Sequence, residues 1–210
     1  MKNLETEFKW DAQTPRAFLR MLGAVKKVAG AAAVSPAKVL YLTDIYLDHS
    51  DGSFEKERLA FRVRRSGKQW EATFKTRTQL INGKAVRREE TQALAGVKNL
   101  RQALAELDAQ KRWKKLPVCG LVPLFRICNK RRVRWITTPH FQAELAFDTC
   151  TICAGGKRVF FKEIELELKR GRAQAFDEFA ARLSEKSGLP RATKSKVRTA
   201  HALLKGENIQ

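Results

Sequence analysis

The chain has 210 residues, 43% of them hydrophobic and 30% charged, which is ordinary for a globular protein able to bury a core. No apolar stretch is long enough for a membrane-spanning helix, because the Ala-rich segment 25–39 is interrupted by Lys26, Lys27 and Pro36. With 42 Lys and Arg against 22 Asp and Glu, the net charge of +20 favours polyanionic partners, whether nucleic acid, an anionic membrane surface or phosphate chains.

Strand-like and helix-like segments alternate along the chain, which predicts an α+β protein. In chain order we expect a strand over Asn3–Trp10, a helix over Thr14–Lys27, strands over Val39–Asp48, Arg58–Arg65, Gln69–Thr78 and Val86–Ala93, a helix over Val97–Gln110, strands over Arg132–Thr137, Phe141–Asp148 and Val159–Arg170, and helices over Ala173–Lys186 and Thr193–Leu204. Ser66-Gly67 and Asn82-Gly83 mark tight turns. Without a repeat or linker, residues 1–210 are expected to form one domain, with a helical insertion at about 95–131.

The first strand carries a row of charges. Glu5, Glu7 and Lys9 share one parity, whereas Phe8 and Trp10 share the other, so successive side chains would point to opposite faces. Glu and Lys are poor strand residues, so the row needs an explanation. It also places charges where a secretory signal would have an apolar run, and we expect a cytoplasmic protein.

The later strands repeat this pattern. Charged side chains of one parity oppose apolar ones in nearly every strand; they are Arg62 and Arg64, Lys75 and Arg77, Arg87 and Glu89, Arg132 and Arg134, Glu144 and Asp148, and Glu163, Glu165 and Glu167. A sheet with one solvated face is the plain explanation for any single strand. Across all strands, however, carboxylates gather in the first and last strands and cations in the middle ones.

A closed antiparallel barrel of about eight strands would turn the charged faces inward, with the amphipathic helices covering its apolar exterior. A membrane barrel shares a polar lumen and an apolar exterior, but the helical segments and the charged first strand argue against it. Buried cations need water, counter-charges or an anionic ligand. Arg and Lys bind phosphate oxygens, and carboxylates such as Glu5, Glu7, Glu165 and Glu167 are ligands that suit Mg²⁺ or Mn²⁺.

Cysteine and histidine give weaker signals. Cys150 and Cys153 form a lone C-x-x-C, and Cys119 and Cys128 do not form a second one, so reduced cysteines are favoured over a zinc site that uses all four. His49, His140 and His201 have neither metal-ligand nor catalytic-triad spacing.

The E-x-E-x-K of Glu5, Glu7 and Lys9 resembles the opening signature of the CYTH superfamily, the triphosphate tunnel metalloenzymes. Phe61–Arg64, Thr73–Lys75, Arg87–Glu89, Arg132–Trp135, Glu144–Asp148, Glu163–Lys169 and Lys194–Lys196 resemble its later strands and its C-terminal K-x-K, in order and over nearly the whole chain. The resemblance implies an eight-stranded tunnel that acts on triphosphates. The spacing and Pro123-Leu124-Phe125 look most like bacterial inorganic triphosphatases.

The resemblance also implies roles for individual residues. Substrate oxygens would be bound by Lys9, Arg62, Arg64, Lys75, Arg87, Arg132, Arg134, Lys194 and Lys196. One or two Mg²⁺ or Mn²⁺ ions would be held by Glu5, Glu7, Glu165 and Glu167, with Glu89, Glu144 and Asp148 as further ligands. The catalytic residues would be Glu5, Glu7, Lys9, Lys75 and Glu167.

The family often has R-x-E-x-E where this chain has Thr91 at the last position, so one ligand is missing. Arg126, Lys130 and Arg131 are interpreted as basic surface, able to guide polyphosphate, contact nucleic acid or add solubility. The expected substrate is tripolyphosphate or a related small triphosphate, and no membrane partner is expected. Adenylate cyclase, thiamine triphosphatase, or a non-catalytic tunnel that binds polyphosphate, nucleotide or RNA stay open as alternatives, and the sequence does not predict the oligomeric state.

Overall fold

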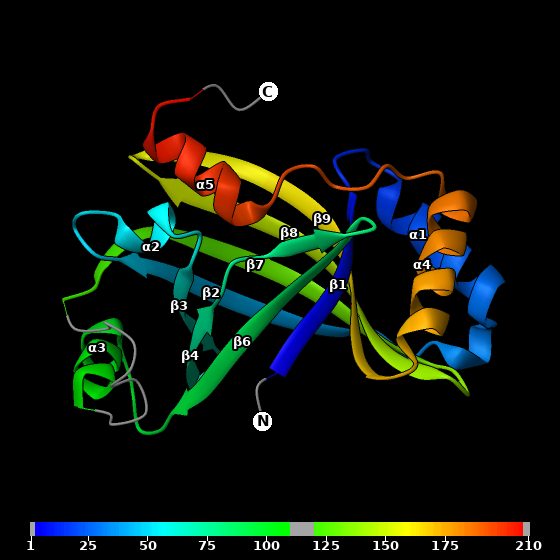
Figure 1. The fold of residues 1–210 in the computed structure, drawn as a ribbon, viewed down its shortest axis with the longest axis horizontal. Coiled ribbons are helices and arrows are strands. Elements are labelled where there is room, and N and C mark those ends of the chain that lie inside the picture. Colours follow the sequence, from blue (N-terminus) through cyan, green and yellow to red (C-terminus); the bar gives the residue numbers. More distant parts are fainter. Residues whose placement is uncertain (1–2, 110–119, 208–210) are drawn as a thin grey trace.

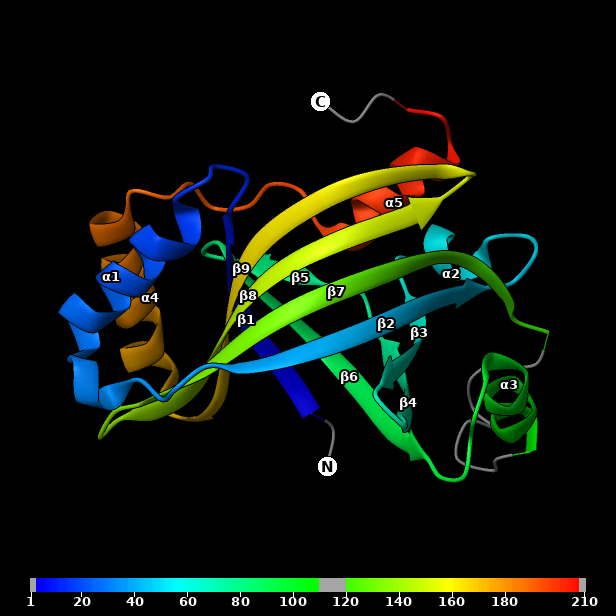
Figure 2. The same ribbon diagram turned by 180° about the vertical axis from the view of Figure 1, so that it is seen from behind.

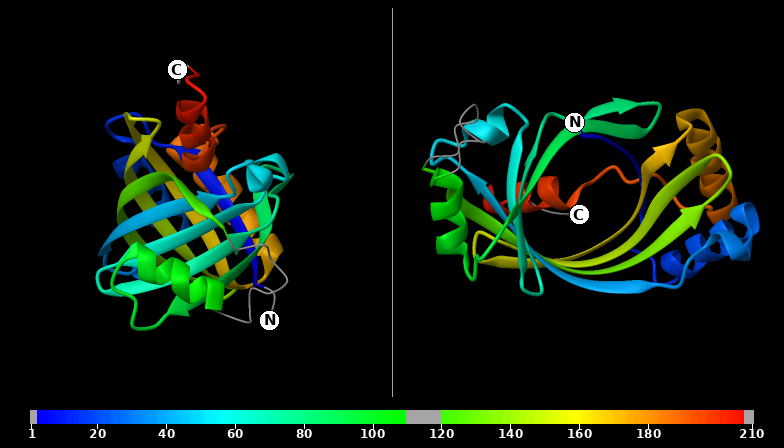
Figure 3. Two further views of the ribbon diagram at one scale, coloured as in Figure 1. Left: turned by 90° about the vertical axis from the view of Figure 1, so that its left-hand side faces the viewer. Right: turned by 90° about the horizontal axis from the view of Figure 1, so that it is seen from below.

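The computed structural model describes residues 3–109 and 120–207. Their strands form one antiparallel sheet that closes into a barrel. Its strands are β1 (Asn3–Asp11), β2 (Lys38–Asp48), β3 (Ala60–Ser66), β4 (Gln69–Lys75), β5 (Gln79–Ile81), β6 (Lys84–Leu94), β7 (Val122–Thr137), β8 (Phe141–Ala154) and β9 (Lys157–Gly171). The order β1-β9-β8-β7-β2-β3-β4-β6 returns to β1 through a β1–β6 pairing, while β5 pairs with β6 outside the ring. Figure 3 (right) looks into this ring. The predicted eight-stranded barrel is confirmed.

Two of the tight turns depend on glycine. Gly67, with φ of 60°, lies in the turn between β3 and β4, and the turn between β5 and β6 has Asn82 at 51° and Gly83 at 74°. Positive φ values at both central residues match the right-handed twist of antiparallel strands, which explains the Asn-Gly pair. Both predicted turns are therefore confirmed.

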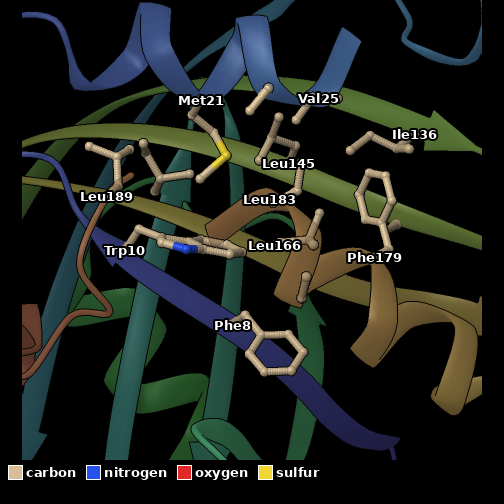
Figure 4. Packing of buried hydrophobic residues seen from close by; sticks show 14 of the residues in the cluster. Phe8, Trp10, Met21, Val25, Ile136, Leu145, Leu166, Phe179, Leu183 and Leu189 are labelled. Carbon is tan, nitrogen blue, oxygen red and sulfur yellow. The ribbon is translucent and has the colours of Figure 1, made fainter. Parts of the chain in front are cut away.

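The largest core lies outside the barrel, where α1 (Ala17–Ala29) and α4 (Ala173–Ser187) pack together over one end of the sheet. Met21 and Val25 of α1 and Leu183 of α4 contact the outward-facing Trp10 and Leu145 of the strands. Figure 4 shows this packing of apolar side chains between helices and strands. Burial of this core gives β1, β8 and β9 a fixed inward face.

A second helical group covers the other end of the outer face (Figure 1). The short α2 (Ser53–Lys56) and α3 (Leu100–Ala109) bury Phe54, Ala103 and Leu107 against Phe61 and Phe74. The predicted insertion at 95–131 therefore contains α3, but its part from Val122 onward is wrong, because those residues belong to the long strand β7.

The last helix, α5 (Lys196–Leu204), corrects the expectation that every helix covers the exterior. Its Ala200 and Leu203 pack on Ile127, Cys150 and Ile152, which have the inward parity of their strands. The helix therefore lies across one end of the barrel (Figure 3, right) and brings Lys196, its first residue, to the interior.

Among the described residues, no helix is both long and apolar enough to cross a membrane.

Candidate functional site

The barrel encloses a cavity of about 1070 Å³, whose wall is mainly charged. Twelve of the predicted site residues line it: Glu5, Glu7, Lys9, Arg62, Arg64, Lys75, Arg87, Glu89, Glu144, Glu165, Glu167 and Lys196. Strand pairing explains the convergence, because residues that are directly opposite on neighbouring strands point to the same face. Since β1 lies between β9 and β6, it brings the acidic last strand and the basic middle strands into one ring.

One group of carboxylates surrounds Lys196. Its Nζ atom lies 2.5 Å from Asp148 Oδ2, 2.5 Å from Glu163 Oε1 and 3.1 Å from Glu165 Oε1. The three carboxylates hold the pKa of Lys196 well above its usual value, although burial alone would lower it. Ser195 caps α5 by accepting a hydrogen bond from the backbone N–H of Arg198 at 3.2 Å, which fixes the start of the helix beside this group.

Arg131 binds the same group from β7. Its guanidinium donates two hydrogen bonds to Asp148, at 2.8 and 2.6 Å, and also contacts Glu165. Lys9 approaches from β1, with Nζ 2.6 Å from Glu165 Oε1 and 3.3 Å from Glu7 Oε1. Burial raises the pKa of Glu163 to about 7, despite the neighbouring lysines.

A second group lies on β2 and β3. Arg64 donates to both oxygens of Asp44, at 2.6 and 2.8 Å, and Arg62 Nη1 lies 3.7 Å from the same carboxylate. Burial would raise the pKa of Asp44, but the two guanidinium groups outweigh it and hold that pKa well below its usual value. Asp44 therefore stays ionised and fixes the fork of Arg64 in the wall of the cavity.

The third group joins β1, β4 and β6. Arg87 contacts Glu5 and lies 3.1 Å from Glu7 Oε1 and 2.8 Å from Glu89 Oε1, and Lys75 contacts Glu89. Burial, together with the nearby Arg87 and Arg62, lowers the pKa of Lys75 to about 8. Burial and the neighbouring Glu7 raise the pKa of Glu5 to about 8.

Three predicted substrate-binding residues do not line the cavity. Arg132 is exposed, and Arg134 lies on the same outward face with Nη1 donating to the backbone oxygen of Ser35 at 2.7 Å. Their placement in the lumen is wrong, because β7 pairs Arg131 with the inward Asp148 and Arg132 with the outward Phe147. Lys194 is also exposed and outside the wall, since the chain turns inward only at Ser195 and Lys196.

The structure adds three residues that the sequence argument did not assign to the site. The sequence predicts Arg131 as basic surface because its predicted strand begins at Arg132, whereas β7 begins at Val122 and gives Arg131 the inward parity of Asp148. Asp44 was missed because its inward neighbours on β2, Leu42 and Tyr46, are apolar. Glu163 belonged to the recognised acidic row, and the structure buries it completely beside Lys196.

The carboxylates fit a divalent cation by their arrangement. Glu7, Glu167 and Glu144 are directly opposite one another on β1, β9 and β8, and like charges in such positions repel unless a cation lies between them. Asp148, Glu163 and Glu165 form a buried acidic cluster, with one ligand oxygen from each within 4.8 Å of the others, and in this structure the ammonium group of Lys196 is their shared cation. Glu163 Oε2 is buried without a hydrogen-bond donor among the described residues, whereas the buried oxygens of Glu5 and Glu7 contact Arg87. These are hard oxygen donors of the kind that Mg²⁺ and Mn²⁺ prefer.

The C-x-x-C motif lies within β8, where residues three apart point to opposite faces. Cys150 is buried under α5 and Cys153 lies on the outer face, so the strand does not present them to one metal ion. The zinc alternative also needed Cys119, which lies outside the described residues. His201 Nδ1 lies 3.3 Å from Glu55 Oε2, and this contact connects α5 with α2.

The protein-family model named CYTH domain matches residues 3–200 of the chain. The chain belongs to the CYTH domain family. The inorganic triphosphatase of Haemophilus influenzae is 26% identical over 164 residues, which are 78% of this chain and 46% of that protein, so the chain spans about half the length of this relative.

Two solved CYTH-like structures share the fold at low identity. HpAC1 from Hippeastrum, which is described as having a dominant triphosphatase activity, superposes with a TM-score of 0.63 at 15% identity, covering 98% of this chain and 97% of that one. The triphosphatase of the Mimivirus capping enzyme superposes with a TM-score of 0.53 at 11% identity, covering 89% and 90%. At these identities, both similarities show a shared fold and nothing about activity.

Proposed function

We propose that this protein is a metal-dependent hydrolase that releases the terminal phosphate of tripolyphosphate, or of a related triphosphate, inside the tunnel. The observation that carries the proposal is the barrel cavity lined by Arg and Lys side chains that neighbouring carboxylates hold in place, as Arg87 is held by Glu7 and Arg131 by Asp148. We further propose that residues 1–210 act as one domain, because strands from both ends of the sequence complete the same ring.

The basic residues bind the triphosphate chain. Arg62, Arg64, Lys75, Arg87, Arg131 and Lys196 present guanidinium and ammonium donors to the cavity. Their carboxylate partners fix them in place, and phosphate oxygens are acceptors of the same charge-assisted kind. Lys9 adds a cation between the two acidic strands.

The carboxylates Glu7, Glu144 and Glu167, with Glu5 and Glu165 beside them, would hold the divalent ion. When bound, such an ion neutralises phosphate oxygens and lowers the cost of charge on the departing group. In hydrolysis, the oxygen of water bonds to the terminal phosphorus while the bridging P–O bond breaks. Diphosphate leaves with the bonding electron pair, and the proton of water passes to a tunnel carboxylate or to solvent. We assign the orientation of that water to Glu167, whose ion pair within the described residues is with Lys169 on its own strand.

Two relatives support this choice of substrate class. The curated relative is an inorganic triphosphatase, and HpAC1 is described as having a dominant triphosphatase activity. The finer assignment to tripolyphosphate is our proposal.

The decisive assay offers tripolyphosphate, ATP and thiamine triphosphate to the purified protein, with Mg²⁺, with Mn²⁺ and with a chelator, and measures phosphate release. We expect fastest release from tripolyphosphate and loss of release with the chelator. Binding of labelled polyphosphate without phosphate release from any substrate would overturn the enzyme proposal in favour of a binding tunnel. Formation of cyclic AMP from ATP as the main reaction would instead assign the tunnel to cyclisation.

A further inference from the structure

The outer face of the sheet is open over β2, β7, β8 and β9, on the side of the barrel that Figure 2 presents to the viewer. At one end, α1 and α4 bury outward side chains such as Phe147 and Ile164. Further along the same strands, α5 packs on the inward face instead. The outward side chains in this part are therefore left to solvent.

Strand register arranges these outward residues in rows across the sheet. One row runs Tyr41, Lys130, Thr149, Lys162, and the next runs Thr43, Cys128, Thr151, Phe160. The flanking rows add Arg126 with Arg158 on one side and Arg132 on the other. We call this set the outer sheet surface.

Among the residues that the structure describes, the cations of the outer sheet surface have no counter-charge. None of its rows contains Asp or Glu, and within the described residues no ion pair involves Arg126, Lys130, Arg132, Arg158 or Lys162. On the opposite face of the same strands, Arg131 of β7 is ion-paired with Asp148 and Lys169 of β9 with Glu167. A concentration of unpaired positive charge on an exposed sheet attracts a polyanion.

Two aromatic side chains stand on this surface. The exposed fraction is 68% for Tyr41 on β2 and 77% for Phe160 on β9. Three strand spacings separate them, or about 14 Å across the sheet. Lys130 Nζ lies 5.8 Å from the centroid of the Tyr41 ring. Exposed aromatic rings on a basic sheet are the means by which proteins stack the bases of single strands.

We propose that the outer sheet surface binds single-stranded nucleic acid, with the cations on the phosphates and Tyr41 and Phe160 stacked on bases. The two rings stand apart and do not form one apolar patch, which disfavours a protein partner or a membrane surface. A duplex would satisfy the cations, but its paired bases are not free to stack on the rings. The proposal is independent of the reaction in the tunnel.

The experiment measures fluorescence anisotropy of labelled single-stranded RNA and DNA that carry a 5′-hydroxyl, so that no triphosphate end can enter the tunnel. Duplex, heparin and phosphatidylserine vesicles are the comparison ligands. Tyr41→Ala and Phe160→Ala are each expected to weaken single-strand binding by at least about fivefold, because one stacked base is lost. Replacing Arg126, Lys130 and Arg158 by Ala is expected to flatten the slope of log K against log salt by about 2.

Matched variants separate this site from net charge and from the tunnel. Lys26→Ala/Lys27→Ala removes exposed positive charge from α1 and is expected to change binding by less than twofold. Arg64→Ala in the tunnel is expected to leave single-strand binding intact. Variants are compared only when their circular dichroism and thermal unfolding match the parent.

The parent protein alone also tests the proposal, through its preference for single strands over duplex. Equal binding of duplex, heparin and single strands, with no effect of the aromatic variants, would show simple polyelectrolyte attraction and overturn the proposal. Binding of vesicles without binding of oligonucleotide would overturn it in favour of a membrane surface.

Discussion

The inner and outer faces of the barrel carry similar numbers of cations on the same strands. The two faces differ in whether these cations are paired with carboxylates. Inside, Arg64 forms a fork on Asp44 and Arg131 forms one on Asp148. Outside, Arg65 and Arg132 are exposed and without carboxylates in their rows. Consecutive arginines thus have opposite environments because side chains alternate along a strand. Paired cations are held in a fixed geometry that suits a small, multiply charged substrate, whereas unpaired ones suit a flexible polyanion.

The largest expected effect is on turnover. Glu7→Gln removes charge from the row of opposed carboxylates and is expected to lower kcat for tripolyphosphate by about 100-fold or more, with a much smaller effect on anion affinity. Glu90→Gln, at an exposed position of β6 with the opposite parity, is the control and should leave kcat unchanged. Steady-state phosphate release over a range of Mg²⁺ concentrations measures both. An equal loss of kcat in Glu7→Gln and Glu90→Gln would contradict the proposal that the reaction takes place on the inner face.

The next effect is on substrate binding. Arg64→Ala is expected to weaken tripolyphosphate binding by about 30-fold or more, because the cavity loses a guanidinium group that Asp44 holds in a fixed position. Arg65→Ala, one residue away on the outer face, should change it by less than twofold. Calorimetric titration of both variants gives the comparison, and similar small changes in both would contradict the assignment of the inner face to the substrate.

The ion pairs of Asp44 with Arg62 and Arg64 give a prediction about stability. Asp44→Asn leaves two buried guanidinium groups without their main counter-charge, and we expect the free energy of unfolding to fall by about 3 kcal/mol at pH 7. The folded-state pKa of Asp44 lies below the unfolded value of 3.8, so its contribution is present above that pH and is lost as the pH falls through the folded-state value.

Urea unfolding of both proteins from pH 7 downward tests this sign. The difference in stability between parent and variant should shrink below about pH 3.8. A difference that stayed constant or grew on acidification would show that the ionised carboxylate is not the source of the stability.

The smallest effect concerns the outer sheet surface. Tyr41→Ala is expected to change kcat/KM for tripolyphosphate by less than twofold, because its ring points away from the cavity. A tenfold loss in this variant, with thermal unfolding unchanged, would show that the two faces are coupled.

Much of the barrel could be predicted from the sequence because period-two alternation fixes the faces of each strand once its position is known. The first strand and the acidic row of β9 were placed correctly for this reason. The prediction for β7 was wrong because 122–131 lacks a clear polar alternation, since Ile127 and Phe125 face inward under α5. In β7 the charged pair Arg132 and Arg134 faces outward and the apolar Val133 has the inward parity of Arg131, so the expectation that charged rows face the lumen fails on this strand.

Other parts of the site depend on tertiary contacts that no local pattern shows. Asp44 is a single charge in an apolar row, and its importance follows from the arginines that β3 brings opposite it. The inward packing of α5 was not predicted, because an amphipathic helix has the same pattern on either face of a sheet. The inward position of Lys196 follows from that packing, and the exposed position of Lys194 follows from the cap at Ser195.

The measurement that tests the account most directly compares Arg131→Ala with Arg132→Ala in tripolyphosphate hydrolysis. The two residues are chemically identical and adjacent, and the structure separates them only by the face on which they lie. We predict that Arg131→Ala lowers kcat/KM by about 30-fold or more and that Arg132→Ala stays within twofold of the parent. Loss of activity in Arg132→Ala with a normal Arg131→Ala would contradict the assignment of the tunnel as the place of reaction.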